Sequence, residues 1–230
     1  MTRQLTPSLY EQFQCQGMIK LPQFVSKDKL HNIKQELLQD LKRLNIYSAN
    51  KILSKQLQHI SPFQQIVKLS QAVQKPKKLD LIFASFYDLA NNVSKYSLNP
   101  SFTSQLLLSL PNQGSWNMEA LNWHIDVSTL QFPGVQIFLL IDDVQRFGGA
   151  TMALGGSHHL KKRYTLNSLR ALTSTQEIGQ AFVLDGHQLS IFEMCGKAGD
   201  IFIMDMRLLH TPSINSTSHL RMMATSRFFI

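Results

Sequence analysis

The sequence predicts a mainly β fold in which α-helices cover one sheet of a double-sheet jelly roll. In the first hundred residues, apolar side chains recur at helical spacing. From Phe102 onward the pattern changes to short apolar runs separated by Gly, Pro, Asn and Asp, which is typical of antiparallel strands. Eight such runs follow one another, and eight strands suit a jelly roll.

Three helices are expected before residue 100, at Lys27–Leu44, Pro62–Val73 and about Lys78–Val93. Ser26 and Ser61 stand where N-cap residues are favoured, and Pro62 takes the first helical position, where its missing N–H costs nothing. Asn99-Pro100 then marks a break. We therefore expect residues 1–98 to form a helical layer.

The eight expected strands share short length and an apolar character. They are Thr103–Leu110, Leu121–His124, Gly134–Asp142, Thr151–Leu154, Ala181–Leu184, Leu189–Cys195, Asp200–Met206 and Leu220–Phe229. The longest apolar run, Ile137–Ile141, is far too short to span a bilayer and indicates a buried strand. Residues 99–230 would form the jelly-roll core, and the chain of 230 residues would form one domain.

The composition favours a globular protein, with 43% hydrophobic and 17% charged residues. The two cysteines provide neither a disulfide framework nor a zinc pattern, which fits a reducing compartment. Met1–Tyr10 is polar and lacks the apolar stretch of a signal peptide. We therefore expect a cytoplasmic protein without a membrane segment.

The formal net charge of +8 is unevenly distributed along the chain. Residues 1–100 hold 14 Lys and Arg against 6 Asp and Glu, whereas residues 101–230 hold 9 of each. A basic surplus is compatible with nucleic acid, a membrane surface or an anionic substrate. Because these lysines are scattered among Gln, Asn and Leu on expected helices, a solvated helical face explains them better.

One imidazole and one carboxylate stand two positions apart in Trp123-His124-Ile125-Asp126. On a strand this spacing directs both side chains to the same face. A second imidazole, His210, follows a distant expected strand, and Arg221 comes eleven residues later. Two imidazoles and one carboxylate without a thiolate match the facial ligand set of non-heme Fe(II), which leaves positions open for a chelating substrate and O2.

The segment from about Asn122 to Phe228 resembles the phytanoyl-CoA dioxygenase-like (PhyH) family of Fe(II)/2-oxoglutarate-dependent oxygenases. The matching residues are Trp123–Asp126, Gly148–Thr151, Gly155–His158, Gly199–Ile203, Arg207–His210 and Arg221, with a less specific match at Gly17–Pro22. The resemblance implies a cupin-like double-stranded β-helix that binds Fe(II) through His124, Asp126 and His210. It also implies that 2-oxoglutarate and O2 are consumed, that succinate and CO2 are released, and that hydroxylation of a small molecule is the default outcome. In related halogenating enzymes a small residue replaces the carboxylate, so Asp126 argues against halogenation.

Cosubstrate contacts are expected first from Arg221. The resemblance implies that this planar, permanently charged guanidinium binds the distal carboxylate of 2-oxoglutarate. Gln136 interrupts an apolar strand, where an unpaired polar group is costly, and falls where the family has a polar contact. Gln105 and Ser109 are further candidates from the strand before the His-x-Asp motif. All three could instead face solvent or cap loops.

Structural roles for the ligand candidates also stay open. His124 could be a core histidine bonded to Asp126, and His210 a loop histidine. Arg221 could be a strand arginine paired with Asp205 or Asp200.

Because the family that the sequence resembles acts on a broad range of substrates, we expect a small metabolite as substrate and a role in natural-product or amino-acid-derivative biosynthesis. Residues 45–100 and 112–119 are expected to shape its pocket. The run Lys161-Lys162-Arg163 is interpreted as a solvated loop, with contact to an anionic substrate as the alternative.

Three other functions are considered. Arg221 and Arg227 form an Arg-x5-Arg pair that also occurs in nucleic-acid demethylases of the same superfamily. The step from His210 to Arg221 is shorter than in that group, and no aromatic and basic cluster for base flipping stands out, so nucleic acid is not favoured as a partner. The barrel could also be a non-catalytic module that keeps a metal for stability. A metal-dependent isomerase or hydrolase would use the same ligands without 2-oxoglutarate.

Overall fold

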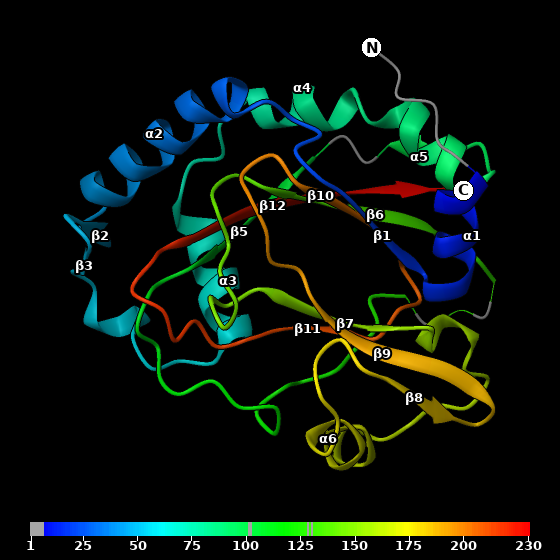
Figure 1. Ribbon diagram of the computed structural model, residues 1–230. Helices are drawn as coiled ribbons and strands as arrows, with labels where there is room; N and C mark the ends of the chain where they lie inside the picture. The colour runs from blue at the N-terminus through cyan, green and yellow to red at the C-terminus, as the bar shows by residue number, and fades with distance from the viewer. Residues whose placement is uncertain (1–6, 101–102, 128, 130) are drawn as a thin grey trace.

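The computed structural model describes residues 7–100, 103–127, 129 and 131–230, and forms two antiparallel sheets with a helical layer over one of them (Figure 1). The segment Met1–Tyr10, in which we expect no targeting signal, lies partly outside the described residues. The predicted jelly roll with helical cover is confirmed.

The larger sheet has six strands in the order β1-β10-β6-β12-β4, with β5 also paired to β12. Its strands are β1 (Met18–Leu21), β4 (Asn99–Pro100), β5 (Gln105–Ser109), β6 (Gly134–Leu140), β10 (Ile201–Asp205) and β12 (Arg221–Phe229). The strand β1 was not predicted, and its pairing with β10 means that the first 98 residues also contribute to the sheet. The other strands of this sheet, β4 aside, lie within their predicted ranges.

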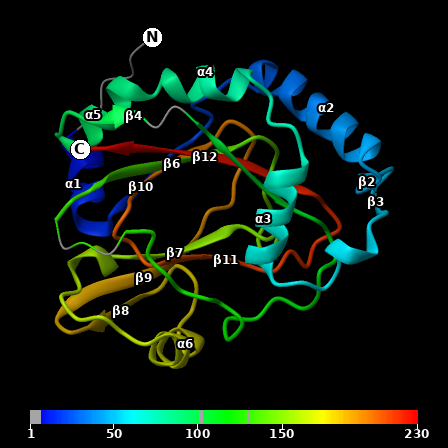
Figure 2. The same cartoon turned by 180° about the vertical axis from the view of Figure 1, so that it is seen from behind.

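The smaller sheet has four strands in the order β11-β7-β9-β8. They are β7 (Thr151–Gly155), β8 (Ala181–Leu184), β9 (His187–Glu193) and β11 (His210–Pro212). A separate two-stranded ribbon joins β2 (Tyr47–Ser48) to β3 (Lys51–Ile52). Figure 2 shows the two main sheets facing each other, with α3 (Pro62–Ala72) beside β5 at one side of the space between them.

Four helices, α1, α2, α4 and α5, cover the outer face of the larger sheet, and α6 lies beside the smaller sheet (Figure 1). Their bounds are α1 (Pro7–Gln16), α2 (Lys27–Arg43), α4 (Lys78–Ala84), α5 (Tyr87–Ser94) and α6 (Leu166–Ser174), and the 3-10 turns are η1 (Lys55–Leu57) and η2 (Ser157–His159). Ser61 caps α3 by accepting a hydrogen bond from Gln64 N at 3.3 Å, as predicted. Ser26 takes the N-cap position of α2, but its side chain makes no capping bond.

The single helix expected over Lys78–Val93 is instead two helices, α4 and α5. The chain tightens at their junction, where Ser85 Oγ donates to Ile82 O at 2.6 Å and Phe86 N donates to Phe83 O at 3.0 Å. Phe83 and Phe86 are both buried and meet edge to face, with ring centroids 5.6 Å apart. The bend lets both rings enter the core between the helices and the sheet.

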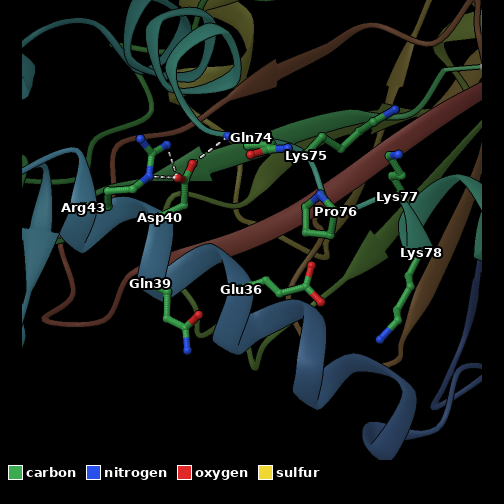
Figure 3. Close-up of a pocket in the computed structure, with 9 residues that line it drawn as sticks. All are labelled: Glu36, Gln39, Asp40, Arg43, Gln74, Lys75, Pro76, Lys77 and Lys78. Carbon is green, nitrogen blue, oxygen red and sulfur yellow. Dashed lines mark hydrogen bonds and ion pairs between the residues drawn. The ribbon is translucent and has the colours of Figure 1, made fainter.

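The helical layer is also joined by polar contacts (Figure 3). Asp40 on α2 accepts hydrogen bonds from Arg43 of its own helix and from Gln74 N, which follows α3, at 2.7 Å. Lys77 and Lys78 line the same hollow as residues of α2, one of the helices that cover the outer face of the larger sheet. Within the described residues, no helix is long and apolar enough to cross a membrane.

Alternation along the strands of the larger sheet separates two apolar cores. In β6, Val135, Ile137 and Leu139 belong to the core under the helices, whereas Phe138 and Leu140 belong to the core between the sheets. Gln136 therefore faces the interior of the barrel. The same alternation directs Gln105 on β5 inward, as it does Arg221 on β12.

The expected strand Leu121–His124 is not formed, and this segment is a loop beside β11 that makes a single backbone bridge, from His124 to His210. Trp123 is buried there, and its Nε1 donates to Thr173 Oγ1 of α6 at 3.1 Å. Asn122 N donates to Thr211 Oγ1 at 3.1 Å. Side-chain anchors thus take the place of a strand ladder.

Candidate functional site

His124 and His210 come together through their backbones. His124 N donates to His210 O at 3.0 Å, and His210 N donates to His124 O at 2.9 Å, an isolated antiparallel bridge. Residues that exchange both hydrogen bonds lie directly opposite each other, so their side chains project to the same side. The two imidazole centroids are 4.5 Å apart.

Both imidazoles are oriented by a second contact. The Nδ1 atom of His124 lies 3.0 Å from Asn122 O, and that of His210 lies 3.0 Å from Leu208 O. A backbone carbonyl only accepts, so Nδ1 carries the proton in each ring. The unprotonated Nε2 atoms are left to face the same point, as ligand atoms for a metal would.

Asp126 brings its carboxylate to that point. Its Oδ1 lies 3.9 Å from His124 Nε2 and 3.8 Å from His210 Nε2, too far for a hydrogen bond. One ligand atom from each of these three residues lies within 4.8 Å of the others. The interpretation of His124 as a core histidine bonded to Asp126 does not match this separation.

The second carboxylate oxygen of Asp126 is held by Arg227. Arg227 Nη2 donates to Asp126 Oδ2 at 2.5 Å. Burial alone raises the pKa of Asp126, but its interactions with His210 and with Arg227, which also donates a hydrogen bond to it, outweigh burial and lower the pKa below its ordinary value. Burial lowers the pKa of His210 to about 4. An ionised carboxylate and a neutral imidazole are the protonation states that a metal requires.

The three groups border a cavity of about 240 Å³ between the sheets. Gln105, Gln136, Thr225 and Arg227 provide its polar wall. Gln136 Nε2 donates to Thr225 Oγ1 at 3.0 Å, whereas the buried Oε1 of Gln136 has no partner among the described residues. Apolar side chains close the rest of the cavity, among them Phe63 and Ile66 of α3.

Arg221 lies deeper on the inner face of β12 and does not line this cavity. Its side chain is buried, and Nη1 contacts Met223 Sδ at 3.3 Å. Nε and Nη2 have no hydrogen-bond partner among the described residues. Burial lowers the pKa of Arg221 to about 9, so the group is still charged at neutral pH.

The alternative ion pairs for Arg221 are not formed. Asp205 is bound by Arg207, with Nη2 to Oδ2 at 2.6 Å, and Asp200 is bound by Lys20 at 2.8 Å. A buried guanidinium with open donors is costly unless an anion completes it. Arg221 therefore fits a carboxylate-binding group.

Ser109 is the Cα partner of Arg221 across the β5–β12 pair, so both side chains face the barrel interior. Its hydroxyl already donates to Gln65 Oε1 at 3.2 Å. Gln65, which is 1% exposed, also accepts from Leu110 N at 2.8 Å, so it fixes α3 against β5. Ser109 takes part in this structural network and does not line the cavity.

Among the polar residues of the cavity, Arg227 and Thr225 were not assigned to it from the sequence. Arg227 was considered only as part of an Arg-x5-Arg pair, and Thr225 was not considered. Both follow Arg221 at even steps on β12, so strand alternation starting at Arg221 would have placed them on its face.

A comparison with protein-family models shows the family to which this chain belongs. The model of the family described as phytanoyl-CoA dioxygenase (PhyH) matches residues 13–223. The chain belongs to the PhyH family. The predicted resemblance is confirmed, and with it the enzyme class, Fe(II)/2-oxoglutarate-dependent oxygenase, and the cofactors of that class.

Solved structures agree with this membership of the PhyH family at the level of the fold. The chain is similar to the non-heme alpha-ketoglutarate-dependent carbocyclase SnoK from nogalamycin biosynthesis, with 14% identity over 98% of this chain and 84% of that one and a TM-score of 0.66. It is also similar to EctD from S. alaskensis, solved with 2-oxoglutarate and 5-hydroxyectoine, with 18% identity, coverage of 98% and 76%, and a TM-score of 0.65. AviO1 from Streptomyces viridochromogenes Tue57 matches with 16% identity, coverage of 100% and 97%, and a TM-score of 0.66. No curated protein sequence matched the chain.

Proposed function

We propose that this PhyH protein hydroxylates a small-molecule metabolite, with Fe(II) held by His124 Nε2, Asp126 Oδ1 and His210 Nε2. The observation that carries the proposal is the convergence of these three atoms, with both Nδ1 protons committed to backbone carbonyls. Two imidazoles and one carboxylate form an open set that suits Fe(II). When bound, iron and 2-oxoglutarate supply O2 activation, with 2-oxoglutarate converted to succinate and CO2.

The chain's own residues would bind and orient the cosubstrate. Arg221 offers two unpartnered donors to the distal carboxylate, and the Gln136 amide has a second N–H besides the one that it donates to Thr225. Thr225 holds the Gln136 amide in place through a hydrogen bond of 3.0 Å. Gln105, which lines the cavity, completes the proposed set, whereas the hydroxyl of Ser109 is committed to Gln65.

Water exclusion would come from the apolar part of the cavity. Phe138 and Leu107 belong to the core between the sheets, and Phe63 of α3 stands edge-on to His124 with ring centroids 6.2 Å apart. Such a surround protects a reactive site from solvent. Asp126 fills the third ligand position, which supports hydroxylation over halogenation.

The small-molecule class is supported by the solved structures that share the fold. SnoK is named as a carbocyclase of nogalamycin biosynthesis, and EctD was solved with 5-hydroxyectoine. We extend this class to the present chain and propose a role in natural-product or amino-acid-derivative biosynthesis. The demethylase alternative is less well supported, because Arg227 is bound to Asp126 and the lysine-bearing helices α2 and α4 cover the outer face of the larger sheet.

The test is succinate release that depends on both Fe(II) and 2-oxoglutarate. Asp126→Ala is expected to abolish it while circular dichroism shows a retained fold, because one ligand and the Arg227 contact are lost together. Asp88→Ala, which removes an exposed carboxylate on α5, is the matched control and should leave release unchanged. Release near the wild-type rate in Asp126→Ala would refute the ligand assignment.

A further inference from the structure

His124 also borders a second cavity, of about 400 Å³. It lies between the loop that carries the His-x-Asp motif, the segment after β7 and the residues that precede β11. Its volume falls within the range of about 300 to 1,000 Å³ that small-molecule sites occupy. The ring of His124 thus separates two spaces, one inside the barrel and one toward the segment after β7.

The inner wall of this second cavity is apolar. Trp123, Leu160, Leu169 and Leu209 line it, and all four belong to, or pack against, the core between the smaller sheet and α6. Trp123 is fixed by its bond to Thr173, so this wall is preformed. A wall of this kind accommodates the apolar body of a ligand.

The remaining wall of the cavity is basic. It includes Lys161, Lys162, Arg163 and Arg207, and the described residues that line it include no Asp or Glu. Two neighbouring carboxylates offset part of this charge: Asp205 binds Arg207 at 2.6 Å, and Asp185 lies 3.6 Å from Lys162. Among the residues that the structure describes, four cations lie with two carboxylates, which leaves a positive surplus beside His124.

We propose that the primary substrate of this enzyme carries an anionic group, a carboxylate or a phosphate monoester, on an apolar body. The apolar body lies against Trp123 and Leu209 next to His124, and the anion is bound by Lys161 and Arg163. Charged groups at the edge of a cavity raise the local concentration of an oppositely charged ligand and fix its orientation. This inference rests on the proposed function, because it assigns the substrate class of the same site.

The hollow of the helical layer offers a matched control (Figure 3). Lys77 and Lys78 also line a hollow with basic residues, but Glu36 and Asp40 of α2, one of the helices that cover the outer face of the larger sheet, line it too. Changing two cations to glutamate in either place alters the net charge by the same amount. A general effect of net charge would therefore appear equally in both double variants.

The experiment measures binding of two fluorescent probes that share one skeleton, 8-anilinonaphthalene-1-sulfonate and the uncharged N-phenyl-1-naphthylamine. K161E/R163E is expected to raise the dissociation constant of the sulfonate about tenfold and to leave the neutral probe nearly unchanged, because charge-assisted contacts become repulsive. K161Q/R163Q should give a smaller loss in the same direction. K77E/K78E should change neither constant.

Displacement of the sulfonate distinguishes the two kinds of anion. 3-Phenylpropionate and 2-phenylethyl phosphate are compared with the neutral 3-phenylpropanamide. Preferential displacement by the carboxylate or by the phosphate supports the proposal and names the group. Equal displacement by the amide, or equal effects of K161E/R163E and K77E/K78E on the sulfonate, would overturn it.

Succinate release by the wild-type protein is measured in parallel. If succinate release is absent while K161E/R163E still weakens binding of the sulfonate but not of the neutral probe, the proposed function fails and the anion site stands. If succinate release is present and K161E/R163E changes the dissociation constants of the two probes equally, the proposed function stands and the substrate class fails.

Discussion

Arg227 and Asp126, which are 101 positions apart in the sequence, are joined by a hydrogen bond of 2.5 Å from Nη2 to Oδ2. Because Arg227 takes one carboxylate oxygen, the other oxygen is left to face both histidines, at 3.9 and 3.8 Å. A contact behind a metal ligand fixes its orientation and its ionisation. We therefore assign Arg227 as a positioning residue for Asp126.

Arg227→Met should weaken Fe(II) binding about 10- to 100-fold, the usual effect of losing such a supporting contact. The measurement is the Fe(II) concentration that gives half-maximal succinate release, with metal binding followed by calorimetry. Arg227→Lys keeps the charge but loses the planar donor, so its Fe(II) requirement should fall between those of the wild type and of Arg227→Met. Arg43→Met removes a comparable arginine–aspartate contact on α2 and serves as control. Equal iron requirements in wild type and Arg227→Met would contradict the assignment.

Arg221→Met should raise the 2-oxoglutarate concentration needed for half-maximal succinate release. Methionine retains much of the buried volume but removes a charge-assisted contact worth about 1.5 to 3 kcal/mol, or roughly 10- to 150-fold in affinity. Arg221→Lys tests whether charge alone is enough. An unchanged requirement would remove Arg221 from the cosubstrate site and favour an activity that does not use 2-oxoglutarate.

Thr173→Val should destabilise the loop that carries His124. The change keeps the shape of the side chain but leaves the buried indole N–H of Trp123, now 3.1 Å from Thr173 Oγ1, without its acceptor. An unsatisfied buried donor costs about 1 to 3 kcal/mol. Urea unfolding measures the loss, and Thr173→Ser, which keeps the hydroxyl, should lie close to wild type. Equal stabilities of the Val and Ser variants would show that the bond contributes nothing.

Stability should decline on acidification because of His158. Burial lowers its pKa from 6.5 to about 4 in the folded protein. Between these two values the unfolded chain binds more protons, so the free energy of unfolding falls as the pH decreases from 6.5 to 4. His158→Gln removes this proton site while an amide can still donate to Gln14 O, which lies 3.0 Å from His158 Nε2.

The decline of the free energy of unfolding should therefore be shallower in His158→Gln, by at most about 1.4 kcal/mol for each pH unit. Burial also lowers the pKa of His210, to about 4, so part of the decline persists in both proteins. Urea unfolding at several pH values between 4 and 7 gives the two slopes. Identical slopes would exclude His158 as a source of the pH dependence.

The sequence by itself determined the fold class, the bounds of α2 and α3, and most strands, because these depend on apolar periodicity and local caps. It also gave His124, Asp126 and His210 as ligand candidates, by residue type, spacing and family resemblance, and the structure brings these three together. It could not determine that Leu121–His124 is a loop, since an apolar run also fits a loop held by Trp123 and Thr173. The split between α4 and α5 was equally hidden, because the turn follows from packing of Phe83 and Phe86.

Only the tertiary structure decided how the site is assembled. The backbone bridge between His124 and His210 and the contact from Arg227 to Asp126 join segments that are 86 and 101 residues apart. The basic cavity beside His124 likewise combines the segment after β7 with residues that precede β11. Sequence patterns report which face of an element is buried, whereas these contacts depend on how two sheets close on each other, which no local pattern records.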